Sequence, residues 1–136
     1  TLVAGVKAAQ RHNAKAIEAA LAAIAAAAGD AANSVASDDG AGFIAALQAN
    51  AVGLAALGAA ASLELETEAV RQVRAALGRS DVCVKTTGAG GGDIAIVVGP
   101  PTLDVTETTQ RIIQAGCNVI PLSLTSRGVD FEPNAR

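Results

Sequence analysis

The segment whose residues are best suited to bind a ligand is a loop with four glycines within five positions, between two short apolar runs. Residues 85–93 read Lys-Thr-Thr-Gly-Ala-Gly-Gly-Gly-Asp. Glycines let successive backbone amides point into one concavity, which forms a nest for phosphate oxygens. The lysine adds a cation and the threonines add hydroxyl donors. The candidate phosphate- and substrate-binding residues are therefore Lys85, Thr86, Thr87, Gly88, Ala89, Gly90, Gly91, Gly92 and Asp93.

This loop fits neither of the two common nucleotide-binding motifs. The dinucleotide fingerprint started by Gly88 and Gly90 requires a third glycine where the chain has Asp93. The nucleotide P-loop requires Gly-Lys-Ser/Thr and a following helix, whereas this loop leads into an apolar run typical of a strand. The carboxylate of Asp93 repels phosphate unless it accepts hydrogen bonds from loop amides or lies near a magnesium ion. From the residues alone, a phosphate nest and a bulged hairpin whose glycines avoid a packed helix are equal alternatives.

Composition narrows the possible partners of a chain that its 136 residues predict to be a single domain. The apolar fraction of 51% comes mostly from alanine, and Phe43 and Phe131 are the only aromatic residues. The chain therefore lacks an aromatic platform for stacking bases. The net charge is −3, and the sequence has no basic stripe that would neutralise a nucleic-acid backbone. We expect no nucleic-acid partner.

The cysteines and the longest apolar segment bear on localisation. Cys83 and Cys117 each lie in an apolar run, which favours buried free thiols over a disulfide framework and indicates a cytoplasmic protein. The apolar segment 14–28 is interrupted by Lys15 and Glu18, and alanine inserts poorly into a bilayer. No signal-peptide pattern is present, so we expect no membrane association.

The first half of the sequence is helical by its apolar spacing. A first helix is predicted to end at Gly29-Asp30, followed by a loop over 31–42 with turn-forming residues. Its apolar face carries Ile17, Leu21, Ile24 and Ala28. Gln10 and Asn13 lie upstream on the same face, which indicates that this end is solvated or meets another surface.

Two more helices are predicted before the strands begin. The second is predicted to end at Gly58, and its stripe carries Phe43, Leu47, Asn50, Leu54 and Leu57. The third is predicted from Leu65 to Leu77, with Gly78 as the stop. The residues of the third helix expected to face inward are Val70, Val73 and Leu77.

The second half of the sequence changes to short β-branched runs. Residues 82–84 and 94–98 are predicted strands that flank the glycine loop. Asp104, with Glu107 three residues later, forms a capping-box pattern that opens a helix to about residue 115. A last strand is predicted over 117–122. The order predicts an α+β fold, in which helices pack on one face of a small, largely antiparallel sheet.

The glycine loop closely resembles a motif of a known kinase superfamily. Together with Ile94-Ala95-Ile96 it is similar to the third motif of the GHMP kinases, which include galactokinase, homoserine kinase, mevalonate kinase and phosphomevalonate kinase. Further upstream, four residues resemble the Asn-Gln-x-Leu-Leu-x-x-Leu-Gly segment of the same superfamily. They are Asn50, Leu54, Leu57 and Gly58.

The resemblance covers residues 43–129 and has departures. Asp93 after the glycines is similar to bacterial phosphomevalonate kinase, where mevalonate kinase has glycine and cysteine. Ala51 replaces the glutamine that follows the asparagine, and Ala59-Ala60-Ala61-Ser62-Leu63 replaces Val-Ser-Thr/His-Pro. These departures concern the choice of substrate and leave the loop motif intact.

The resemblance implies that residues 1–136 are a ferredoxin-like GHMP kinase C-terminal domain. The ATP-binding motif and the catalytic residues of the superfamily belong to an N-terminal domain that this chain lacks. The implied parent is a cytoplasmic phosphotransferase, most like phosphomevalonate kinase of isoprenoid biosynthesis. Its ATP and Mg²⁺ would be bound mainly by the N-terminal domain, in cis or as a separate chain. The resemblance places no catalytic residue and no metal ligand in this chain, which is expected to be inactive alone.

The implied partners are that N-terminal domain and a small phosphorylated substrate, and the sequence leaves open whether the chain forms a homo-oligomer. Mevalonate kinase or a sugar kinase remains the alternative within the superfamily. A non-catalytic ligand-binding or assembly module, with alanine-rich helices packed on a partner, is an alternative outside it. A hydrolase with Thr1 as nucleophile needs a base, and the single histidine, His12, lies about three helical turns away.

Overall fold

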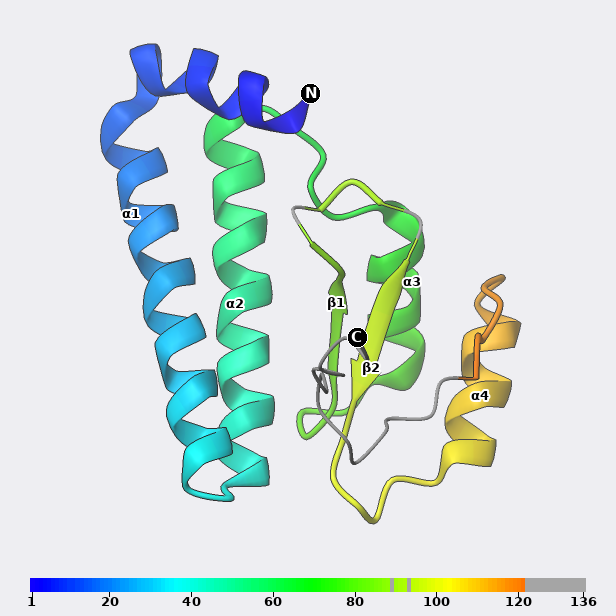
Figure 1. Ribbon diagram of the computed structural model, residues 1–136. Helices are drawn as coiled ribbons and strands as arrows, with labels where there is room; N and C mark the ends of the chain where they lie inside the picture. The colour runs from blue at the N-terminus through cyan, green and yellow to red at the C-terminus, as the bar shows by residue number, and fades with distance from the viewer. Residues whose placement is uncertain (89, 93, 122–136) are drawn as a thin grey trace, which may run out of the picture.

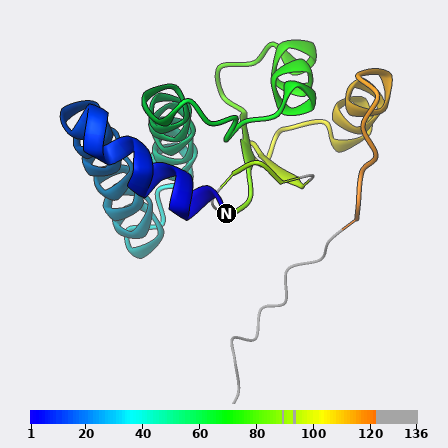
Figure 2. The ribbon, with the colours of Figure 1, turned by 90° about the horizontal axis from the view of Figure 1, so that it is seen from above.

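The computed structural model of the chain describes residues 1–88, 90–92 and 94–121. Within these residues it consists of four helices and a two-stranded antiparallel sheet (Figure 1). In chain order the elements are α1 (Leu2–Ala36), α2 (Gly40–Ala61), α3 (Glu68–Leu77), β1 (Cys83–Thr86), β2 (Ala95–Val98) and α4 (Val105–Gln114). Seen from above, α2, α3 and α4 form an arc along one side of the sheet (Figure 2). The predicted combination of helices with a small antiparallel sheet is confirmed, and the described chain is mostly helical.

The two long helices α1 and α2 lie side by side along most of their length (Figure 1). The glycine at position 53 permits this approach, because a Cβ there would lie 2.8 Å from Cγ1 of Ile24. The buried residues of the cluster they share are Ile17, Ala20, Leu57, Ala61 and Leu65. Burial of apolar side chains, large ones as well as alanines, therefore holds the pair together.

Helix α1 is longer than the sequence predicts. The helix continues through Gly29-Asp30 to Ala36, and the predicted loop over 31–42 shrinks to residues 37–39. Glycine inside a helix costs about 1 kcal/mol relative to alanine. Here Ala27 is buried, and Ala31 and Ser34 are half-buried, so packing against α2 continues past the glycine and outweighs this local cost.

A kink at Asn13 divides α1 into two segments and redirects the first one. Asn13 has non-helical backbone angles, φ −140° and ψ 42°. Its Nδ2 donates a hydrogen bond of 3.0 Å to the carbonyl of Ala60, which belongs to the last turn of α2. Carbonyls in the last turn lack an intrahelical donor. Of the two predicted alternatives for this end, solvation or contact with another surface, Asn13 shows the second, because it caps the C-terminus of α2.

The predicted end and stripe of α2 are both wrong in part. Gly58 is buried inside the helix, where a Cβ would lie 2.8 Å from the carbonyl oxygen of Leu63. The helix ends instead at Ala61, and Ser62 is its left-handed cap with φ 54°. The predicted stripe is largely half-buried, because α2 contacts α1 on one side and β1 on another. The residues buried along α2 are Ile44, Ala46, Gly53, Leu57, Gly58 and Ala61.

Helix α3 and the sheet form a second core, and most predictions there are confirmed. The helix begins at Glu68, three residues after the predicted start, and ends at Leu77, with Gly78 as its left-handed cap at φ 57°. Strands β1 and β2 pair antiparallel, with Val84 opposite Val97. The buried residues of this cluster are Val70, Val73, Leu77, Val82, Val84 and Ile112.

The predicted strand over 117–122 is wrong for the residues that the structure describes, 117–121. The reason lies in the way α4 ends. Asp104 caps the start of α4 as predicted, since its Oδ1 accepts the Glu107 amide at 2.9 Å. At the other end, Gly116 has φ 83° and its amide donates to the Ile113 carbonyl. The Cys117 amide then donates to the Ile112 carbonyl at 3.2 Å, which completes a Schellman motif. The first amide of the predicted strand is therefore used in the helix cap. Leu122 lies outside the described residues.

Helices α1 and α2 both have the length and the apolar composition that a membrane span requires. Mean hydropathy reaches 1.3 in α1 and 1.6 in α2 over the most apolar window of each. Core helices of soluble proteins meet the same criteria, so this property alone does not assign the pair to a bilayer. The expectation of no membrane association stays a prediction.

The packing of the helical pair predicts that two truncations to alanine lower the free energy of unfolding by very different amounts. Ile17 has no exposed surface, so Ile17→Ala leaves a cavity and is expected to lower the free energy of unfolding by about 2–5 kcal/mol. Val52 in α2 is 70% exposed, and Val52→Ala is expected to change it by less than about 0.5 kcal/mol. Urea titration followed by circular dichroism measures both. Equal effects would contradict the assigned pairing of α1 with α2.

The two free cysteines are expected to differ in reactivity. Cys83 is 1% exposed, and burial raises the pKa of its thiol, whereas Cys117 is half-buried. The thiolate is the reactive form, so iodoacetamide at pH 8 is expected to alkylate Cys83 at least about tenfold more slowly than Cys117. Peptide mass spectrometry gives both rates, and urea serves as the control that brings them together. Equal rates in the native protein would show that β1 is more accessible than described.

Candidate phosphate-binding loop

The glycine loop connects β1 to β2 and starts from a regular hairpin stem. The last paired residues of the stem are Thr86 and Ala95. Beyond them the Thr87 amide donates to the Ile94 carbonyl at 3.1 Å, and the Thr87 hydroxyl donates to the same oxygen at 3.3 Å. Ala89 and Asp93, two of the predicted site residues, lie outside the described residues.

Three glycines of the loop adopt backbone angles that other residues rarely tolerate. Gly88, Gly90 and Gly91 have φ values of 63°, 88° and 65°. These angles lie in the left-handed region, where a Cβ costs about 1–2 kcal/mol. The fourth glycine, Gly92, does not have such a φ, and a Cβ there would have open space around it. The glycines of this loop are therefore not equivalent.

The loop packs against residues that link α2 to α3. The Gly91 amide donates a hydrogen bond of 2.7 Å to the carbonyl of Leu65. A Cβ on Gly90 would overlap this same carbonyl oxygen. A Cβ on Gly91 would lie 3.2 Å from the side chain of Leu2, at the start of α1. Close backbone packing thus explains two glycines, and it removes the Gly91 amide from the predicted set of phosphate donors.

The remaining predicted donors are presented unequally. No described residue supplies an acceptor for the amides of Gly88, Gly90 and Gly92. Lys85 is half-buried, and its ammonium donates to the carbonyl of Thr86 at 2.9 Å. Thr86 itself is 3% exposed, whereas Thr87 is exposed. The described part of the site therefore offers backbone amides, one lysine and one accessible threonine.

Arginines of α3, which the sequence analysis did not single out, hold the segment under the loop. Arg74 forms an ion pair with Glu66 and donates to the carbonyl of Val84 in β1 at 2.7 Å. Arg71 donates to the Glu66 carbonyl at 2.7 Å and forms an ion pair with Glu64 at 3.2 Å. The sequence pattern that could have indicated them is a set of alternating glutamates, followed by two arginines three residues apart. Their role is to fasten the α2–α3 link to the sheet that supports the loop.

Lys85 and Arg74 bring positive charge to β1, the strand that leads into the loop. Burial raises the pKa of the Cys83 thiol, and the charges of Lys85 and Arg74 offset part of that rise. Glu66, which pairs with Arg74, is only 15% exposed at its side chain. The negative charge of Glu66 is thus compensated by Arg74 within the support of the loop.

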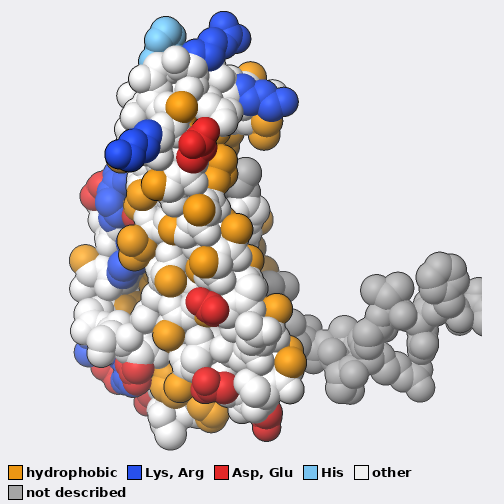
Figure 3. All heavy atoms as spheres, turned by 90° about the vertical axis from the view of Figure 1, so that its left-hand side faces the viewer, with side chains coloured by type: hydrophobic (Ala, Val, Ile, Leu, Met, Phe, Trp, Pro, Cys, Tyr) orange, Lys and Arg blue, Asp and Glu red, His pale blue; other side chains and the backbone are white. Residues whose placement is uncertain are grey.

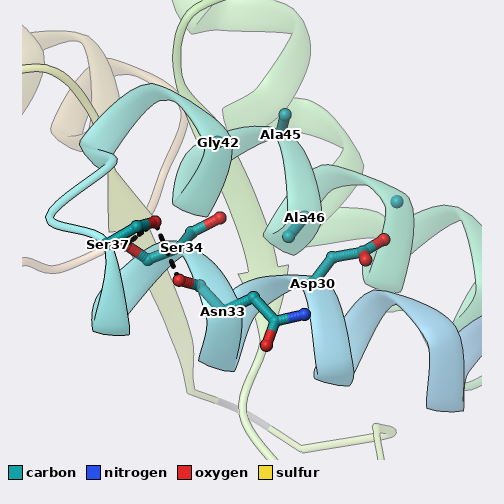
Figure 4. A pocket seen from close by; sticks show the side chains of 8 residues that line it. Asp30, Asn33, Ser34, Ser37, Gly42, Ala45 and Ala46 are labelled. Atoms are coloured by element: carbon teal, nitrogen blue, oxygen red, sulfur yellow. Dashed lines mark hydrogen bonds between the residues drawn. The ribbon is translucent and has the colours of Figure 1, made fainter.

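Two surface depressions lie elsewhere in the described structure. One, of about 510 Å³, lies between the end of α1 and the start of α2 and is lined by small or polar residues (Figure 4). A smaller one of about 250 Å³ lies between the end of α3 and α4. None of the described loop residues lines either depression. Across residues 1–88, 90–92 and 94–121, no group of three His, Cys, Asp or Glu side chains has a metal-binding arrangement.

Known proteins add no assignment to this geometry. Comparison of the chain with protein-family models, with curated proteins and with solved structures found no match. The interpretation of the loop therefore depends on its residues and their contacts.

The packing of the loop predicts different effects for two glycine substitutions. Gly90→Ala introduces both a strained φ and an overlap with the Leu65 carbonyl, so it is expected to lower the free energy of unfolding by about 2–4 kcal/mol. Gly92→Ala introduces neither and is expected to change it by less than about 1 kcal/mol. Chemical denaturation compares the two variants. If both are silent, the loop does not pack on the α2–α3 link.

Proposed function

We propose that this chain is the C-terminal, phosphate-side domain of an ATP-dependent small-molecule kinase. The observation that carries the proposal is the glycine hairpin loop itself, with left-handed glycines above a stem that carries Lys85 and the exposed Thr87. The resemblance of residues 85–93 to the third GHMP kinase motif supports the same assignment. Phosphomevalonate kinase is the proposed subfamily, and the fold is proposed to be the ferredoxin-like one of that superfamily.

Phosphoryl transfer depends chiefly on positioning and on stabilisation of negative charge, so donors and cations are the expected contribution of such a loop. In the proposed site the Gly88 and Gly92 amides donate to a phosphate of the substrate, and Lys85 supplies positive charge. Thr87 turns its hydroxyl from the Ile94 carbonyl to the ligand. The Gly91 amide is not included, because it is bonded to Leu65.

The proposed division of labour assigns ATP and Mg²⁺ to an N-terminal domain. The start of α1 lies against the loop, where Leu2 approaches Gly91 (Figure 1). A domain joined ahead of Thr1 would therefore begin beside the loop and have its own site within reach.

A second candidate function is a non-catalytic ligand-binding or assembly module. The contact of Gly90 and Gly91 with Leu65 favours it, because part of the glycine content serves packing. The two candidates differ in whether the parent protein transfers phosphate and in whether Lys85 contributes to that transfer.

Lys85→Met in the full-length parent is expected to lower kcat/KM for the phosphorylated acceptor by about 10–100-fold, because a charge-assisted contact is lost. The acceptors to compare are phosphomevalonate, mevalonate and galactose, with ATP and Mg²⁺. Lys7→Met, at an exposed lysine of α1, is the matched control and is expected to have no effect. Residues 1–136 alone are expected to turn over no ATP.

Three outcomes would count against the kinase proposal. Phosphorylation of none of the three acceptors would favour the ligand-binding module. A silent Lys85→Met would remove Lys85 from the site. ATP turnover by residues 1–136 alone would contradict the division of labour between two domains.

A further inference from the structure

The face of α1 turned away from α2 carries a regular seam of small residues. Its members follow one another at alternating spacings of three and four residues and are all exposed: Ala19, Ala22, Ala26 and Gly29. Spacings of three and four residues place side chains on one stripe of a helix. The opposite stripe, which contains Ile17, Ala20 and Ala27, is buried against α2. Helix α1 therefore has two packing seams, of which the described structure covers one.

Small residues on such a seam allow the backbones of two helices to approach closely. The covered side of α1 already shows this kind of approach, since the bare backbone of Gly53 lies against Ile24. Alanine and glycine alone do not identify what covers the outer seam, because they offer little chemistry of their own. The charged residues at its two ends supply that information.

Charges of opposite sign lie at opposite ends of this outer face. Lys15 precedes the seam on this face and Asp30 follows it, whereas Lys7 and Arg11 lie on the first segment of α1, beyond the kink at Asn13. Glu18 is the exception, three residues after Lys15. In the space-filling view of this side, basic side chains predominate at the upper end and acidic ones along the middle of the lower half, although acidic side chains also lie among the upper basic ones and basic ones along the left edge (Figure 3). A surface with this polarity is complementary to a copy of itself turned end for end.

These charges are also uncompensated inside the chain, unlike the arginines elsewhere. Arg71, Arg74, Arg79 and Arg111 each form an ion pair with a nearby carboxylate. Among the described residues, no ion pair involves the charged residues of α1. Their arrangement thus adds nothing to the internal salt bridges of the fold, and it remains available for another molecule.

We propose that two copies of this chain associate through the outer face of α1, with their helices antiparallel. A two-fold axis between Ala22 and Ala23 brings Lys15 of each copy level with Asp30 of the other, because both positions are equally far from that axis. The interface is then self-complementary, as two-fold dimers require. The opposed helices also align their dipoles favourably. This inference is independent of the proposed kinase function.

Charge reversal tests the pairing of Lys15 with Asp30. Residues 1–136 are expected to dimerise in analytical ultracentrifugation at low salt. Lys15→Glu or Asp30→Lys alone places like charges together at both ends and is expected to raise the dimer Kd by at least about tenfold. The double variant restores opposite charges and is expected to recover dimerisation. Gln110→Glu, on exposed α4, changes the charge away from this face and is the matched control.

The test has clear opposing outcomes once circular dichroism shows that each variant retains its helical content. A monomer at about 200 µM, a concentration far above micromolar affinity, would overturn the proposal. A dimer that neither single variant weakens, or that the double variant fails to restore, would overturn it as well. Flotation of the protein with phosphatidylcholine vesicles, without dimerisation, would show that a bilayer covers this face instead.

Discussion

The backbone contact between the Gly91 amide and the Leu65 carbonyl connects the two halves of the described structure. Leu65 belongs to the buried cluster of the α1–α2 pair, and Gly91 belongs to the loop of the sheet. The contact requires the left-handed glycines of the loop, because a side chain at position 90 would occupy the place of the Leu65 oxygen. The position of the loop is therefore set by the long helices as well as by its own strands.

The segment that carries Leu65 is held from both sides. Arg71 and Arg74 fasten it to α3 and β1, and Gly58 lets it turn closely over the end of α2. Asn13 caps the same end of α2 and turns the first segment of α1 toward the loop (Figure 1). Polar contacts thus converge at one end of the helical pair, where the candidate site lies. The far end of the pair carries the short turn between α1 and α2 and the depression of about 510 Å³.

This arrangement divides the glycines of the loop between packing and binding. Gly90 and Gly91 are required for contact with the helices, whereas Gly88 and Gly92 face open space. A phosphate site in this loop is consequently narrower than four glycines suggest and depends more on Lys85 and Thr87. The same reasoning applies to α1, whose small residues serve a known packing partner on one face and leave the other face for a second molecule.

Local patterns alone were sufficient for α3, α4 and the hairpin, because an amphipathic stripe, the cap at Asp104 and β-branched runs flanking glycine act over a few residues. The composition of the candidate loop could likewise be read from the sequence. Tertiary structure decided the lengths of α1 and α2, since packing between them outweighs the cost of Gly29 and Gly58. It also decided that Cys117 begins no strand and that Gly91 donates to Leu65. These features depend on partners distant along the chain, which local sequence patterns do not specify.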